Sequence, residues 1–178
     1  MNIKIKRLVT ASVLLALALV LPLLTGQVPK IGKALCPMHF PVIICGYFCG
    51  IPYGVAVGII APLLRYLIFG MPVIIPQGLG MSFELATYAL VASALYCKFK
   101  NKKLRVYYSL IPAIVIGRII YGIAKFFICK IANIDFDIWI YFVDAIPEAL
   151  PGIILQIILI PVLVLILEKA FPETIKNS

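Results

Sequence analysis

Long apolar runs separated by short polar stretches dominate this chain. Most of the runs reach the roughly 20 residues that a helix needs to cross the hydrocarbon core of a bilayer. The pattern therefore predicts an all-α membrane protein, a bundle of six transmembrane helices in a single integral membrane domain, 1–178. The expected spans are Leu8 to Leu24, Pro41 to Ile51, Tyr53 to Phe69, Leu79 to Tyr96, Val106 to Cys129 and Ile146 to Leu167.

The second and third spans are short and hinged. As a helix, Pro41 to Ile51 is about 16 Å long, whereas the bilayer core is roughly 30 Å thick. Glycine and proline interrupt the stretch from Pro37 to Tyr88 repeatedly, and the expected hinges lie at Gly50 to Pro52 and at Gly70 to Gly78. Irregular backbone at membrane depth persists only where it packs on protein or lines a cavity, as in the binding sites of transporters. We therefore expect this stretch to carry a binding site.

The composition limits the class of protein. A chain that is 63% hydrophobic, with a mean hydropathy of +1.12, would expose far more apolar surface than a soluble protein can. Six crossings with short loops use all 178 residues, so we expect no separate ATPase or catalytic domain. A signal peptide is the alternative interpretation of the basic head, Met1 to Arg7, and the apolar run that follows it. We favour a membrane span because no small-residue cleavage site closes the first run and the chain beyond it is itself membrane-embedded.

The formal charge of +9 comes from basic residues in short runs beside the apolar segments. Such runs set membrane topology, and no basic stripe interleaved with aromatic residues indicates nucleic-acid binding. With both termini in the cytoplasm, ten Lys and Arg residues lie inside and three outside, as the positive-inside rule requires. The inside residues are Lys4, Lys6, Arg7, Lys98, Lys100, Lys102, Lys103, Arg105, Lys169 and Lys176, and the outside ones are Lys30, Lys33 and Lys130.

This topology predicts a multi-pass protein of the plasma membrane. Thr25 to Met38 is expected to be an ordered outer loop, and Lys130 to Asp144 a polar outer segment. The connections after spans one, three and five then meet at the outer face, which is the geometry of an outward-facing pocket.

Polar side chains inside the spans form three helical faces. A charge at bilayer depth costs about 2.5 to 3.5 kcal/mol, so these groups should face the bundle interior and be paired or solvated. An alternative is that Arg118 or Lys125 pairs with Glu148 or Glu84 only to hold helices together. The faces are Gly80, Glu84 and Tyr88 on the fourth span, Arg118, Tyr121 and Lys125 on the fifth, and Asp144, Glu148 and Gly152 on the sixth, with Gln156 one turn deeper.

Motifs of enzymes and metal sites are absent from the sequence. The chain has no HExxH, GxSxG or GxxxxGK[ST] motif, and its one histidine cannot form a histidine cluster. Cys36 and His39 supply a pair of ligands where a structural zinc site needs about four. Cys45 and Cys49 fit small buried side chains, and the five cysteines show no disulfide framework. We therefore expect no enzyme activity, no metal and no cofactor.

Several segments together resemble the substrate-specific S components of energy-coupling factor (ECF) transporters. They are the basic head, the small-residue first helix, the hinged second and third spans, and the sequences LCPMHFPVIICGYFCGIPYGVAVG and PLLRYLIFGMP...FELATY. The resemblance implies a six-helix membrane subunit that captures a vitamin from outside and topples in the membrane to release it. It also implies partners, namely a scaffold membrane protein and two cytoplasmic ATPases.

The resemblance also implies residues for each role. Docking on the scaffold falls to Ser12 and Ala16, whose i, i+4 spacing lets another helix approach closely. The family's usual form has alanine at both positions, so Ser12 departs from it. The family pocket is built from the loops after spans one and three and from spans four to six. It implies substrate contacts from His39, Gln77, Glu84, Tyr88, Arg118, Tyr121, Lys125, Trp139 and Glu148.

The charges also bear on the substrate. Two cations on the fifth span, Arg118 and Lys125, favour a carboxylate or phosphate, whereas Glu84 and Glu148 would accept hydroxyl or amine donors. Pantothenate has this mixture of groups, and the PMHFPV and FGMP segments are most similar to pantothenate-type S components. A vitamin B6 form, a niacin-type molecule or a queuosine precursor also fits. A membrane scaffold or small membrane enzyme with structural buried charges is the alternative from a different class.

Overall fold

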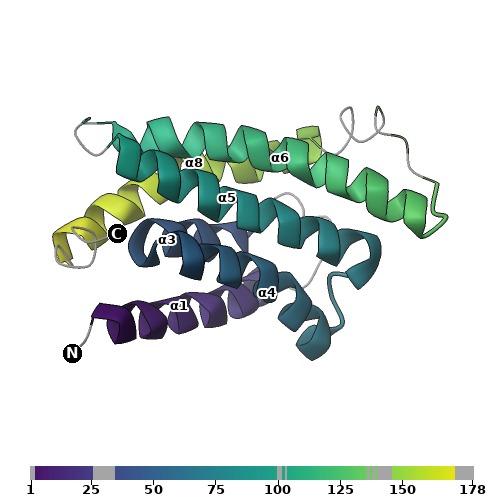
Figure 1. The fold of residues 1–178 in the computed structure, drawn as a ribbon, viewed down its shortest axis with the longest axis horizontal. Helices are drawn as coiled ribbons and strands as arrows, with labels where there is room; N and C mark the ends of the chain where they lie inside the picture. The colour runs from purple at the N-terminus through teal and green to yellow at the C-terminus, as the bar shows by residue number, and fades with distance from the viewer. Residues whose placement is uncertain are drawn as a thin grey trace.

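The computed structural model describes residues 3–25, 35–99, 102, 104–135, 137, 139 and 146–170 of the chain. All regular structure in these residues is helical (Figure 1). Five helices are long and apolar enough to cross a membrane, and α3 is a shorter apolar helix. This confirms the all-α membrane bundle. The elements are α1 (Ile3–Val20), η1 (Leu21–Thr25), α3 (His39–Cys49), α4 (Ile51–Phe69), η2 (Ile74–Gly78), α5 (Leu79–Lys98), α6 (Arg105–Ile131) and α8 (Ile146–Ala170).

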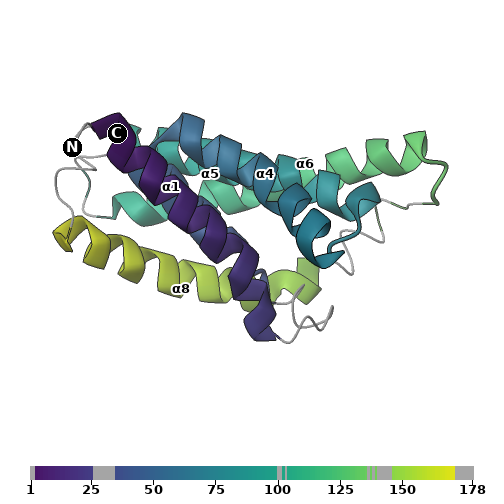
Figure 2. The same ribbon diagram turned by 90° about the horizontal axis from the view of Figure 1, so that it is seen from below.

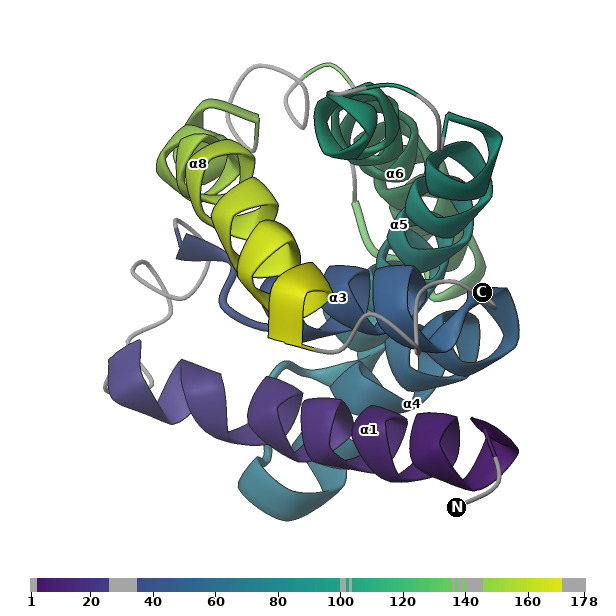
Figure 3. The ribbon, with the colours of Figure 1, turned by 90° about the vertical axis from the view of Figure 1, so that its left-hand side faces the viewer.

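The short helix α3 lies at the centre of the bundle. Each of its residues is buried, and α1, α4, α5 and α8 all pack against it (Figure 3). The most extensive helix pair is α5 with α6, which run antiparallel along one side. Figure 2 shows α8 on the side away from α4, α5 and α6, with α1 running obliquely across the bundle. A helix too short to span a bilayer is therefore enclosed by longer ones, which explains how a fully apolar segment of this length is accommodated.

The ends of the helices follow from local chemistry. Pro22 has no backbone N–H to donate, and α1 gives way to the tighter turn η1 just before it. Gly50 has φ 87° and separates α3 from α4. Gly70, with φ 72°, ends α4 and donates its backbone N–H to the Tyr66 carbonyl oxygen at 2.7 Å. Positive φ is accessible to glycine at little cost, so both predicted hinges are confirmed.

Other glycines of the central stretch lie inside helices and do not break them. A Cβ atom built on Gly54 would lie 2.7 Å from the Gly46 Cα atom, and one on Gly58 would lie 2.7 Å from the Ala86 backbone nitrogen. These positions let the backbones of α3, α4 and α5 approach each other closely. The expectation that glycine and proline interrupt the stretch repeatedly is therefore wrong at these positions, because the glycines serve helix packing.

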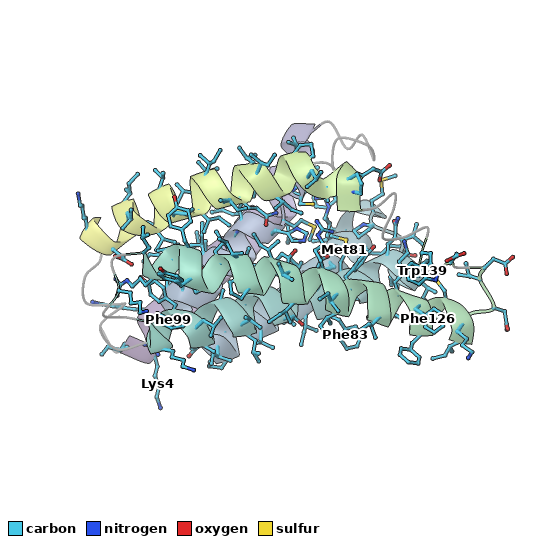
Figure 4. All side chains as sticks on the ribbon, turned by 90° about the horizontal axis from the view of Figure 1, so that it is seen from above. Lys4, Met81, Phe83, Phe99, Phe126 and Trp139 are labelled. Atoms are coloured by element: carbon cyan, nitrogen blue, oxygen red, sulfur yellow. The ribbon has the colours of Figure 1, made fainter. Side chains whose placement is uncertain are left out.

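The two ends of the bundle carry different connections. Lys4 near the N-terminus and Phe99 at the end of α5 lie at one end, whereas Phe126 and Trp139 lie towards the other (Figure 4). The connection from α4 to α5 is also at the second end (Figure 1). This arrangement agrees with the predicted topology, whose sidedness stays a prediction. Residues 26–34 of the expected loop Thr25 to Met38 lie outside the described residues, as do residues 136, 138 and 140–144 of the polar segment Lys130 to Asp144.

Candidate functional site

A buried carboxylate stands at the centre of the polar side chains inside the bundle. Glu84 on α5 is 1% exposed. The Arg118 Nη1 atom lies 3.2 Å from its Oε1 atom, and the Tyr88 hydroxyl donates a hydrogen bond to the same oxygen at 3.2 Å. The His39 Nε2 atom lies 3.5 Å from Oε2. Side chains from α3, α5 and α6 thus surround one acidic group, which we call the Glu84 cluster.

The sequence spacing on α5 and the glycines facing it create this arrangement. Gly80, Glu84 and Tyr88 recur every fourth residue, so they share the face of α5 that packs on α6. A Cβ atom built on Gly80 would lie 2.9 Å from the Tyr121 ring. Likewise, a Cβ atom on Gly117 would overlap the Tyr88 ring. Each glycine therefore makes room for an aromatic ring on the other helix.

Cys36 is a member of the cluster that sequence reasoning missed. Arg118 donates a hydrogen bond from Nη2 to the Cys36 Sγ atom at 3.2 Å. A turn, in which the His39 backbone N–H donates to the Cys36 carbonyl oxygen at 3.1 Å, brings Cys36 beside His39. Burial raises the pKa of the Cys36 thiol, so the neutral thiol is the acceptor. The three-residue spacing of Cys36 and His39 carried the signal, but it suggested only a metal ligand pair.

His39 contributes a buried ring that lies close to the Glu84 carboxylate but does not form a hydrogen bond with it. It is 2% exposed, and in the described part of the chain neither ring nitrogen makes a hydrogen bond. The ring instead packs against that of Tyr88, with 5.2 Å between the centroids. A buried polar atom without a hydrogen bond costs about 1 to 3 kcal/mol, so such an atom calls for an explanation beyond packing.

The other predicted substrate contacts are spread along the bundle. Tyr121 is buried, and the Lys125 Nζ atom lies 5.7 Å from the centre of its ring, one turn further along α6. Gln77 is half-buried in η2. Trp139 is 76% exposed, and Glu148 is exposed in the first turn of α8. The structure therefore joins His39, Glu84, Tyr88 and Arg118 directly and places Tyr121 against Gly80, one turn from Glu84. Lys125 lies beyond Tyr121, and Trp139 and Glu148 are exposed outside the cluster.

A second polar cluster joins the helices at the other end of the bundle, which we call the closed end. Glu168 of α8 pairs with Arg105 at the start of α6, with 2.8 Å between Oε1 and Nη2. The Tyr96 hydroxyl donates a hydrogen bond to the same carboxylate. The Tyr47 and Ser109 hydroxyls share a hydrogen bond of 3.0 Å close by, and the Tyr47 and Tyr96 rings pack together at 4.8 Å. These contacts link α3, α5, α6 and α8 and set how these helices are positioned relative to one another along the bundle axis.

Arg65 has a structural role in a different part of the bundle. It is 4% exposed on α4 and donates a hydrogen bond from Nη1 to the Leu19 carbonyl oxygen near the end of α1. Its guanidinium carbon also lies 5.2 Å from the centre of the Phe69 ring. A cation near the C-terminal carbonyls of a helix is favourable, so Arg65 ties α4 to α1.

The two predicted docking residues lie on the outside of α1. Ser12 and Ala16 are exposed, whereas Ala11, Leu14 and Ala18 are buried and form the face towards α3 and α4. The Ser12 hydroxyl donates to the Leu8 carbonyl oxygen at 3.0 Å, so it is satisfied within its own helix. This face is therefore available to another protein or to lipid.

Comparison with protein families gives a match. The model of a family described as ECF transporter, substrate-specific component, matches residues 6–164. The matched segment runs from the first turns of α1 into the second half of α8, so it includes every residue of the Glu84 cluster. The comparisons with curated proteins and with solved structures found no match.

Proposed function

The chain belongs to the family of substrate-specific components of ECF transporters, which are transport subunits, and we propose that it captures a small water-soluble vitamin or related precursor from outside the plasma membrane. The family implies a substrate-binding role together with scaffold and ATPase partners. Beyond this, the chemistry of the substrate has to be argued from the site. The best candidate is pantothenate, and a vitamin B6 form, a niacin-type molecule or a queuosine precursor are alternatives.

The observation that carries the proposal is the Glu84 cluster. A pair of helices can be held together by one ion pair, and Glu84 with Arg118 would be enough for that purpose. The cluster also contains Tyr88, Cys36 and the His39 ring, all of them buried inside the bundle. Intramembrane polar groups are costly and mark substrate pathways in transporters. The excess of polar groups over what packing needs supports a binding site.

Pantothenate fits the polar groups on and near the cluster. Its carboxylate could share the Arg118 guanidinium or reach Lys125, since an arginine fork offers several donors. Its hydroxyl groups could donate to Glu84, and its amide could use the His39 ring. Because Arg118 already pairs with Glu84, a substrate carboxylate at this point would have to join that pair without displacing it.

We further propose that Ser12 and Ala16 contact the scaffold protein. Their exposed position on α1 supports this role, since side chains of this size allow close approach of a partner helix. Two cytoplasmic ATPases would complete the transporter and supply the energy for release.

The experiment that tests the function is mass spectrometry of whatever co-purifies with the detergent-solubilised protein, followed by calorimetry with the molecule found. We expect a small vitamin-like molecule that binds at nanomolar affinity without turnover. A folded protein that carries no such molecule, and binds none of the four candidates, would contradict the proposal. Chemical turnover of a bound molecule would instead favour a membrane enzyme.

A further inference from the structure

A polar side chain on α8 takes no part in the interactions described so far. Gln156 is fully buried, at 0% exposure, and in the described part of the chain neither atom of its amide group makes a hydrogen bond. A buried amide without partners destabilises the folded protein, so its presence needs a cause. Packing alone would be served better by an apolar side chain of the same size.

The contacts at the closed end of the bundle show how far along the bundle axis Gln156 lies. Glu168 bonds to Arg105 and Tyr96, which sets α8 against α6 and α5. Gln156 precedes Glu168 by twelve residues, and on α5 Glu84 precedes Tyr96 by the same number. At 1.5 Å per residue, both lie about 18 Å from the closed end. Gln156 and Glu84 are thus at one level of the bundle.

Counting residues from the closed end also places α6 and α3 along the bundle axis. Twelve residues after Arg105, α6 reaches Gly117, next to Arg118. On α3, Tyr47 bonds to Ser109, and His39 lies eight residues before Tyr47. Eight residues after Ser109, α6 again reaches Gly117. Four helices therefore bring a polar residue to the level of the Glu84 cluster.

Gln156 also lies on the correct face of α8. It shares the buried face with Gly152, Ile160 and Val164, at intervals of four residues. This face packs against α3 and α6, the helices that carry His39 and Arg118. Figure 3 shows α8 beside α3 and across from the α5 and α6 pair. The amide is therefore enclosed between α8 and these helices, on the side of the Glu84 cluster.

We propose that Gln156 contacts the substrate and recognises a neutral carbonyl group with a hydrogen-bond donor on the same edge, such as a primary amide, a lactam, or an amide carbonyl beside a hydroxyl group. A glutamine amide has one such pair, so it can form two parallel hydrogen bonds with a matching edge. The charges of Glu84 and Arg118 balance each other, and among the described residues at this level the Gln156 amide and the His39 ring contain buried atoms that make no hydrogen bond. This inference rests on the proposed function and narrows the substrate class.

The test compares two apolar variants of the full-length protein in detergent, Gln156→Leu and Gln156→Met. The probes with such an edge are nicotinamide, a 7-deazaguanine base and pantothenate, whose hydroxyl group lies beside its amide carbonyl, and those without one are nicotinate and pyridoxine. We expect wild type to bind a probe of the first group. Each variant should weaken that binding tenfold or more and keep or raise the melting temperature, since an unsatisfied amide is replaced by an apolar side chain. Ile160→Val, one turn deeper on the same face, should leave the affinity within about twofold.

The outcomes separate this inference from the proposed function. Wild type that binds only nicotinate or pyridoxine would overturn the inference and leave the proposed function standing. Wild type that binds no probe and co-purifies with no small molecule would overturn both. A folded Gln156→Met protein with unchanged affinity, or a melting temperature lowered in both variants, would show that the amide serves packing and would also overturn the inference.

Discussion

At the scale of single residues, the chain keeps a charge inside an apolar bundle by giving it several partners. Glu84 is balanced by Arg118, and Arg118 uses its second terminal nitrogen to reach Cys36. Two nitrogens on one planar group thus hold two acceptors from different parts of the chain. A lysine ammonium is a compact point charge and cannot reproduce this fork.

The first prediction concerns Arg118. Arg118→Met removes the cation and leaves a buried carboxylate without its counter-ion, which should lower the free energy of unfolding by about 3 to 5 kcal/mol. Arg118→Lys keeps the charge, so it should stay folded, but it should weaken substrate binding by a factor of about 30 or more because the fork is lost. Melting temperature and affinity are measured on the same preparation.

The control for this prediction is Lys125→Met on the same face of α6. Lys125 lies near the Tyr121 ring, so its removal should lower the melting temperature less than Arg118→Met does. Adding Glu84→Gln to Arg118→Met should recover part of the lost stability, since the uncompensated charge is then absent. A folded Arg118→Lys protein with wild-type affinity would assign Arg118 to helix pairing alone and move the substrate cation to Lys125.

At the scale of elements, the antiparallel pair of α5 and α6 forms the wall that carries the site. Each aromatic ring at this seam lies against a glycine of the other helix, Tyr88 on Gly117 and Tyr121 on Gly80. This close packing brings Glu84 within reach of Arg118. At the other end, Glu168 joins α8 to the pair through Arg105. The level of the site is thus set by contacts made far from it.

The second prediction tests this seam. Gly117→Ala would place a methyl group on the Tyr88 ring, so the ring or one of the helices must shift. We expect a loss of about 1 to 3 kcal/mol in unfolding free energy and weaker substrate binding, because Tyr88 also bonds to Glu84. Thermal unfolding and calorimetry provide the measurements. Val115→Ala, at a position 53% exposed on the same helix, should change both values little. If Gly117→Ala and Val115→Ala showed equal unfolding free energy and equal affinity, the packing between α5 and α6 would accommodate the added methyl group without cost.

At the scale of the whole molecule, the bundle has one end with Lys4 and Phe99 and another towards Phe126 and Trp139, where α4 connects to α5 (Figures 1 and 4). Basic residues concentrate at the first end, which the positive-inside rule assigns to the cytoplasm. The outer face of α1 runs between the two ends and carries the predicted docking residues.

The third prediction tests the sidedness through a native cysteine. Cys97 is exposed at the end of α5, whereas Cys36, Cys45, Cys49 and Cys129 are buried. A membrane-impermeant maleimide should therefore leave Cys97 unmodified in intact cells and label it after permeabilisation. A Cys97→Ser protein controls for labelling elsewhere. Rapid modification of Cys97 from outside intact cells would reverse the predicted topology.

The fourth prediction concerns scaffold docking. Ala16→Trp should abolish vitamin uptake by the assembled transporter while the isolated subunit binds substrate normally, because the added ring projects from an exposed position. Ala18→Trp is the contrast, since Ala18 is 0% exposed and a large ring there should prevent folding. Uptake assays and substrate calorimetry are run on each protein. Normal uptake with Ala16→Trp would remove this face from the docking surface.

The sequence by itself determined the class of the protein, the position of the spans and the two hinges. Length and hydropathy are properties of each segment alone, so the spans could be predicted to within a few residues. The hinges at Gly50 and Gly70 were also local, because only glycine adopts positive φ readily. Periodicity further placed Glu84 and Tyr88 on one face of their helix.

Only the tertiary structure decided which polar groups meet. The sequence left open whether Arg118 faces Glu84 or Glu148, and the structure pairs it with Glu84. It also gave no reason to include Cys36 or to separate Gln156 from other buried polar groups. Periodicity defines the face of a single helix, whereas a contact between helices depends on their relative height and rotation. In this protein those are set by glycines at the helix seams and by bonds at the closed end of the bundle.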